Sequence, residues 1–154
     1  MKILILGGSG FFGKSFLSYF QNNIFPNDSS YTLTVASRNV TSISSLVDSR
    51  YINKKIFLKN IDVTSCNSLP EADLVIHAAV STTEKDYINY PDRERDNIIN
   101  GASNVIRLID KRSSFMYISS GAVYGKQDNL KLEFLEDQAL SLIHISEPTR
   151  LSTI

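Results

Sequence analysis

Short apolar runs alternate along this chain with longer stretches that have the apolar spacing of helices. Five runs read as strands and lie at Ile3–Leu6, Tyr31–Ala36, Lys55–Leu58, Leu74–Ala78 and Phe115–Ile118. A continuous apolar run ended by glycines, such as the first, is typical of a strand buried on both faces. Strands that alternate with helices form βαβ units, so the pattern predicts an α/β fold with a doubly wound parallel sheet.

Three stretches between the strands predict helices. The first runs from Phe11 to about Asn22, and a weaker one spans about Thr41–Arg50. The third begins near Pro91, which a first helical turn tolerates, and reaches about Lys111. The expected apolar face of the first helix consists of Phe12, Phe16, Leu17 and Phe20. That of the third consists of Ile98, Ala102, Val105, Ile106 and Ile109.

The composition narrows the class of protein. The 154 residues are 42% hydrophobic, and 16 basic residues balance 16 acidic ones. Nucleic acid and anionic membranes usually require a basic excess, so neither is an expected partner. The single cysteine excludes an intrachain disulfide, and the sequence has no metal-ligand cluster. Apolar runs fall far short of the roughly 18 residues of a membrane helix, and we expect no signal peptide. We therefore expect a cytoplasmic protein.

The segment Gly7–Ser15 (GGSGFFGKS) joins the first predicted strand to the first predicted helix. It fits GxxGxxG and GxGxxG, and from Gly8 onward it also fits the P-loop pattern GxxxxGK[ST]. Glycines allow the backbone to approach phosphate closely, and a helix N-terminus offers free N–H groups and partial positive charge. The loop therefore predicts phosphate binding and leaves a dinucleotide-binding protein and a P-loop NTPase both open.

Residues downstream of the loop separate these two interpretations. A P-loop needs Lys14 on the phosphates, Ser15 on Mg²⁺ and an acid at another strand end, for which only Asp62 is available. A dinucleotide site instead needs a ribose-binding residue roughly 20 residues after the glycines. No acid occupies positions 36–39, and the Arg38 guanidinium suits a bidentate contact with a 2′-phosphate. This pattern favours NADP over NAD, although Arg38 could also be a solvated loop residue.

Four segments in this order resemble the extended short-chain dehydrogenase/reductase family, the NAD(P)-dependent epimerase/dehydratase group. They are Gly7–Gly13, Asp62–Val63, His77–Ala79 and Tyr117–Gly125 (YISSGAVYG). The last is the most specific, because the family's fifth strand typically ends in a serine pair followed by Val-Tyr-Gly. The resemblance covers residues 1–125 and implies a Rossmann-type domain over 1–139, incomplete here with about five strands.

The resemblance also implies the site. Cofactor contacts are expected at Gly7, Gly10, Phe11, Phe12, Gly13, Ser37, Arg38, Asp62, Val63, Ala78, Ala79 and Ser119. In relatives, the serine five residues before the glycine of Val-Tyr-Gly hydrogen-bonds the reacting oxygen, which makes Ser120 the catalytic candidate. Asp62 or Ser120 could alternatively serve only as a cap, and His77 is expected to be structural. The family often has an asparagine three residues before a helical glycine, whereas Asn97 here stands four before Gly101.

The implied function is hydride transfer with NADP, preferred, or NAD on a nucleotide-sugar-type substrate. Epimerisation, dehydration and reduction all stay open, and relatives often form homodimers. Relatives also carry a Tyr-x-x-x-Lys pair farther along, but no tyrosine follows Tyr124 here, so the chain as written is expected to be inactive. The alternatives are a non-catalytic NADP(H)-binding or sensing protein and, less favoured, a P-loop NTPase.

The last residues have a different character. Leu140–Arg150 (LSLIHISEPTR) matches the in-frame translation of a transposase-based sequencing adapter. Our hypothesis is that the biological sequence ends near Ala139 and that residues 140–154 are a non-native tail. On this hypothesis the chain is a fragment of a longer protein, and His144 has no functional role.

Overall fold

The computed structural model describes residues 1–80 and 84–119 of the chain. It contains two compact units. The first unit comprises Met1–Val80 and Ile99–Ile118, and the second comprises Ser81–Ile98 and Ser119–Ile154. The described part of the second unit contains α3 (Glu84–Asn89) and the beginning of α4 (Pro91–Leu108), whose remainder belongs to the first unit. Ser120 and the predicted tail at 140–154 lie outside the described residues.

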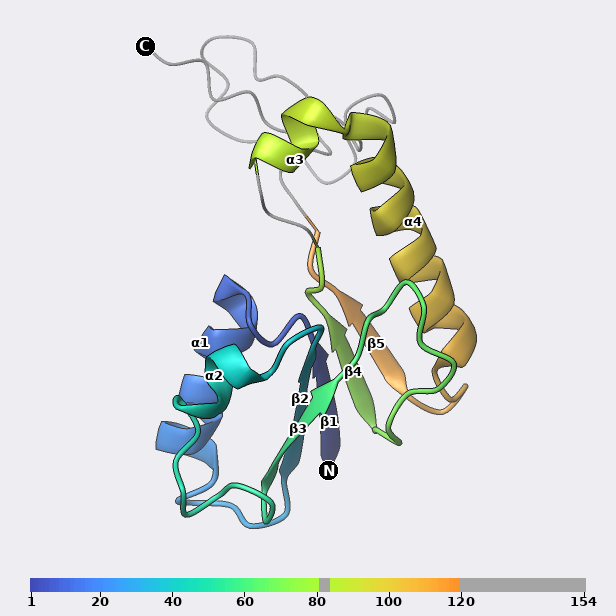
Figure 1. Cartoon of the computed structure of the whole chain (residues 1–154). Coiled ribbons are helices and arrows are strands. Elements are labelled where there is room, and N and C mark those ends of the chain that lie inside the picture. The colour runs from blue at the N-terminus through green and yellow to red at the C-terminus, as the bar shows by residue number, and fades with distance from the viewer. Residues whose placement is uncertain (81–83, 120–154) are drawn as a thin grey trace, which may run out of the picture. The chain divides into compact units, whose positions relative to one another are not determined.

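The first unit is built on a five-stranded parallel sheet (Figure 1). Its strands are β1 (Lys2–Leu6), β2 (Thr32–Ser37), β3 (Ile56–Asn60), β4 (Leu74–His77) and β5 (Ser114–Tyr117). The order β3-β2-β1-β4-β5 places the change in winding direction between β1 and β4. The prediction of a doubly wound, Rossmann-type sheet with five strands is therefore confirmed.

One face of the sheet packs against α1 (Phe11–Tyr19), the π-helical turn η1 (Phe20–Ile24) and α2 (Thr41–Ser44). The core on this face includes Ile3, Ile5, Leu33, Val35, Ile56 and Ile76, together with Leu17, Phe20 and Ile43. Successive strand residues point to opposite faces, so the intervening residues enter the second core. That core joins Leu4, Leu6, Ala36 and Val75 to Val105 of α4. Burial on both faces explains why the strands are continuous apolar runs.

The helices depart from the predicted pattern in two side chains. Phe12 is 48% exposed and Ile106 is 56% exposed, so neither belongs to the core. The buried positions are Gly13 and Leu17 of α1 and Phe20 of η1. Phe12 precedes the first of these by one residue and therefore points to a different side of the helix. On α4, Val105 is the residue that faces the sheet, and its neighbour Ile106 is turned away.

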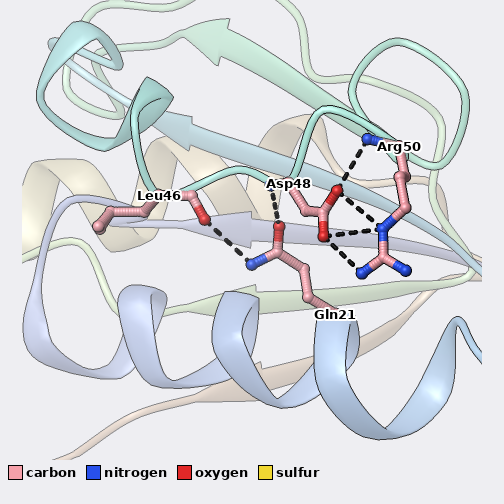
Figure 2. Close-up of polar contacts among 4 residues, drawn as sticks. All are labelled: Gln21, Leu46, Asp48 and Arg50. Carbon is pink, nitrogen blue, oxygen red and sulfur yellow. Dashed lines mark hydrogen bonds and ion pairs between the residues drawn. The ribbon is translucent and has the colours of Figure 1, made fainter.

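The second predicted helix is confined to Thr41–Ser44. Beyond it, the side chain of Gln21 bonds the backbone: Nε2 donates to the Leu46 carbonyl (3.1 Å), and Oε1 accepts the Asp48 N–H (2.6 Å) (Figure 2). These contacts take the place of helical hydrogen bonds and fasten the segment to η1. The sequence did not predict α3. Among the described residues, no helix is both long and apolar enough to cross a membrane.

Candidate functional site

The glycine loop is hydrogen-bonded to the end of the neighbouring strand. Gly7 and Gly8 N–H both donate to the carbonyl of Ala36 in β2, at 2.9 and 2.8 Å. Gly10 N–H then donates to the Gly7 carbonyl at 3.0 Å, which closes a tight turn. Gly7 has φ +91°, a conformation that L side chains rarely adopt. The loop therefore leaves β1 at a sharp angle and is held against β2.

The loop approaches β2, α1 and the end of β4 more closely than side chains would allow. A Cβ at Gly8 would lie 2.2 Å from Val35 Cγ1, and one at Gly13 would lie 2.4 Å from the Gly8 Cα. A Cβ at Gly7 would lie 2.4 Å from the carbonyl oxygen of Ala78, the first residue after β4. The ends of β1 and β4 thus meet through bare backbone at the point where the sheet changes winding direction.

The N-terminus of α1 has the features of an anion site. Its N-cap is Gly10, which supplies no side-chain cap, and its first turn contains no acidic residue. Within the described residues, the N–H groups of Phe11, Phe12 and Gly13 have no hydrogen-bond acceptor. Unpaired N–H groups at a helix N-terminus carry partial positive charge and favour a bound anion.

Lys14 and Ser15 lie on the outer side of α1. Both are exposed, and they line an open groove along the helix with Tyr19 and Asn22. The Ser15 hydroxyl donates to the Phe11 carbonyl at 3.0 Å, so it is bonded within the helix. This is the placement that the dinucleotide interpretation predicts, and it does not supply the metal ligand that a P-loop needs.

The end of β2 contributes a buried hydroxyl and an exposed cation. Ser37 is 6% exposed, and its Oγ has no hydrogen-bond partner in the described part of the chain. Because strand residues alternate, Ser37 shares the α1 side of the sheet with Val35. Arg38 follows it and is exposed. A buried hydroxyl without a partner is costly, and it fits a position that a ligand completes.

The end of β3 carries a carboxylate that is partly used. Asp62 Oδ1 accepts hydrogen bonds from Thr64 N (3.0 Å) and Thr64 Oγ1 (2.7 Å), while its backbone carbonyl accepts Cys66 N–H (2.9 Å). The Thr64 hydroxyl is the main cause that lowers the pKa of Asp62, with a smaller contribution from the charge of Arg38. Asp62 thus closes a turn with one oxygen only, and no helix of the described residues begins there.

At the end of β4, His77 is buried, and its Nε2 has no hydrogen-bond partner among the described residues. It is 1% exposed, its Nδ1 accepts the Ala79 N–H at 3.3 Å, and its ring packs edge-on against Phe115 and Tyr117. Burial lowers the pKa of His77, so the ring is neutral with its proton on Nε2. The ring thereby supports the backbone of Ala78 and Ala79, which faces Gly7.

The predicted site residues of the first unit lie at or after the C-terminal ends of β1 to β4. Because the sheet is parallel, these strand ends lie along one edge of it (Figure 1). Ser119 is exposed, follows β5, and belongs to the second unit. Asn97 also belongs to the second unit, where it donates to Glu94 Oε1 at 3.4 Å. Asn104 of α4, which the sequence pattern did not single out, donates hydrogen bonds to the loop after β3.

The family of this chain is identified by its match to a protein-family model. The model of the NAD dependent epimerase/dehydratase family matches residues 3–146. The chain belongs to this family. No curated protein sequence matches the chain.

Solved structures of epimerases and dehydratases share this fold. A UDP-galactose 4-epimerase is 19% identical with a TM-score of 0.66, and 95% of this chain covers 46% of it. A dTDP-glucose 4,6-dehydratase from Streptomyces venezuelae with NAD and TYD bound is 17% identical with a TM-score of 0.72, and the match covers 92% of this chain and 45% of that one. A UDP-glucuronic acid 4-epimerase from Bacillus cereus in complex with UDP-glucuronic acid and NAD is 20% identical with a TM-score of 0.69, and the match covers 95% of this chain and 48% of that one. This epimerase/dehydratase family chain thus spans about half the length of these proteins.

Proposed function

We propose that the chain provides the dinucleotide-binding part of an NAD(P)-dependent epimerase, dehydratase or reductase that acts on a nucleotide sugar. The observation that carries this proposal is the uncapped N-terminus of α1, whose first N–H groups have no acceptor among the described residues and lie beside a glycine-rich turn. The names of two matched structures include NAD together with a nucleotide or nucleotide sugar, which supports the same cofactor and substrate class here.

The residues present fit a dinucleotide. The N–H groups of Phe11, Phe12 and Gly13 would hold the pyrophosphate, and Gly10, which has no side chain, leaves room for it. Gly7 lets the turn pack directly against the backbone of Ala78. The small, uncharged side chains of Ala78 and Ala79 would let the dinucleotide approach this side of the site closely. When bound, the cofactor supplies hydride transfer at its nicotinamide ring. Ser120 is proposed to hydrogen-bond the reacting oxygen of the substrate.

The adenosine end of the cofactor would lie against the ends of β2 and β3. The unpartnered Ser37 hydroxyl would bond the ribose or its 2′-phosphate, and Asp62 and Val63 would lie beside the adenine. We propose a preference for NADP(H), because Arg38 is exposed and forms no ion pair with any described residue. A guanidinium binds a phosphate in a bidentate manner, whereas free ribose hydroxyls are better matched by an acid.

Fluorescence titration of the 154-residue chain with NADPH and NADH tests the proposal. We expect Arg38→Ala to weaken NADPH binding by about tenfold or more, since hydrogen bonds to charged groups contribute about 1.5–3 kcal/mol. NADH binding should change little. Lys14→Ala removes a charge of the same sign from the outer face of α1, so it is the matched control and should leave both affinities unchanged.

Two results would contradict the proposal. If the unsubstituted chain binds neither dinucleotide, the dinucleotide site is wrong. If it instead binds ATP in a manner that requires both Mg²⁺ and Lys14, the P-loop interpretation replaces it. Equal NADPH affinities before and after Arg38→Ala would overturn the cofactor preference alone.

A further inference from the structure

One face of α4 packs against the loop that follows β3. Gly101 and Asn104 lie three residues apart on this helix, so they share a face. A Cβ at Gly101 would lie 3.0 Å from Val63 Cγ2, which shows how closely the helix approaches the loop. Asn104 reaches the same loop through its carboxamide. The contact joins positions about forty residues apart in the chain.

The carboxamide of Asn104 is fully used in this contact. Its Nδ2 donates to the carbonyls of Val63 and Cys66, both at 2.9 Å, and lies 3.6 Å from Cys66 Sγ. An amide nitrogen carries two hydrogens, so the two carbonyls use both. Arg107 Nη2 donates to Asn104 Oδ1 at 2.6 Å. The opposite orientation of the amide would set Oδ1 against two carbonyl oxygens and would leave Arg107 without its acceptor.

The loop is therefore held from two sides. From within, Asp62 Oδ1 binds the N–H and hydroxyl of Thr64. From outside, Asn104 holds the Val63 and Cys66 carbonyls. Together these bonds fix the peptide unit between Val63 and Thr64 from both of its polar atoms, and they fix the carbonyl of Cys66. They leave Asp62 Oδ2 without a hydrogen-bond partner among the residues that the structure describes.

We propose that Asn104 is a positioning residue for the adenine end of the cofactor site. It holds the loop so that the free oxygen of Asp62 and the adjoining Val63 backbone meet the base in one fixed arrangement. Arg107 acts one step further out by orienting the Asn104 amide. This inference rests on the proposed function, since it assigns a role within that dinucleotide site.

A pair of ligands tests the role more specifically than affinity alone. A free carboxylate oxygen accepts a hydrogen bond from the adenine amino group, but it repels the carbonyl oxygen of hypoxanthine. The unsubstituted chain should therefore bind NADPH about tenfold more tightly than its hypoxanthine analogue. Asn104→Asp keeps the side-chain shape but replaces the donor by an oxygen. We expect this change to weaken NADPH binding by about tenfold and to reduce the preference for adenine to about threefold or less.

Ser103→Asp introduces the same charge at the neighbouring exposed position and serves as the matched control. It should change neither the affinity for NADPH nor the preference for adenine over hypoxanthine. Arg107→Ala provides a second variant at an exposed position, where folding is not at risk, and should produce a smaller loss of adenine preference. If Asn104→Asp and Arg107→Ala lower only the melting temperature and keep the adenine preference of the unsubstituted chain, Asn104 has no positioning role. Failure of the proposed function would be seen separately, as absence of NADPH binding by the unsubstituted chain, and it would overturn this inference too.

Discussion

Gly13 in the first turn of α1 lies so close to Gly8 that a Cβ at Gly13 would stand 2.4 Å from the Gly8 Cα. The same Cβ would lie 2.6 Å from the carbonyl oxygens of Gly7 and Gly8. All three atoms belong to the backbone, so no side-chain rotation can relieve the clash. This contact brings the N–H groups of α1 to the turn, and it makes residue 13 a position of the predicted phosphate loop where only glycine fits without a backbone shift.

Gly13→Ala should accordingly lower the free energy of unfolding by about 1–3 kcal/mol, the usual cost of overpacking. Urea denaturation monitored by circular dichroism measures this change. Gly10→Ala is the matched control, because Gly10 has φ −78° and its Cβ would lie 3.2 Å from a single atom, the Gly7 carbonyl oxygen. A loss at Gly10 as large as that at Gly13 would contradict the packing account.

The Gln21 carboxamide should also contribute to stability. It makes two hydrogen bonds to the backbone of Leu46 and Asp48 (Figure 2). Gln21→Ala removes both and should cost about 1–3 kcal/mol in the free energy of unfolding. Asn22→Ala removes only an exposed 3.3 Å contact with Ser18 and should cost much less. Equal losses for the two variants, measured by urea denaturation, would show that the Gln21 bonds are not stabilising.

The buried His77 should make stability depend on pH. Burial lowers its pKa below 6.5, so between its folded and unfolded pKa the unfolded chain binds a proton that the folded chain does not. The free energy of unfolding should therefore fall as the pH is lowered from about 7.5 through about 6.5. His77→Leu should flatten this dependence. An unchanged slope in the variant would mean that the imidazole does not titrate across this range.

The Asp110 carboxylate gives a direct test of a local ion pair. The side chain and backbone N–H of Arg112 lower the pKa of Asp110 to about 2. A carboxyl group with a lowered pKa stabilises the fold above its unfolded value, here 3.8, and the effect is lost as the pH falls toward 2. NMR titration should give the low pKa in the parent chain and a clearly higher pKa in Arg112→Ala, which stays below 3.8 because the backbone N–H of residue 112 still donates to Asp110. An Asp110 pKa that is the same in both proteins would contradict the assignment.

Most secondary structure was predictable because its cause is local or periodic. The strands are apolar runs buried on two faces, so their positions were clear from the residue pattern and only their ends moved by a residue or two. Side-chain direction was less predictable. Phe12 and Ile106 are apolar and lie beside buried positions, yet a difference of one residue turns a helical side chain by about 100°. The predicted second helix ended early because Gln21, distant in sequence, takes over its backbone groups.

The sequence by itself determined the order of elements, the glycine turn and the location of polar residues after the strands, because each depends on neighbours within a few positions. Only the tertiary structure decided that the Ala36 carbonyl binds the turn, that Ser37 Oγ is buried without a described partner, and that Asn104 holds the Val63 loop. These relationships join residues far apart in the chain. Local propensity contains no information on which distant groups will meet, since that depends on strand order and on how the helices pack against the sheet.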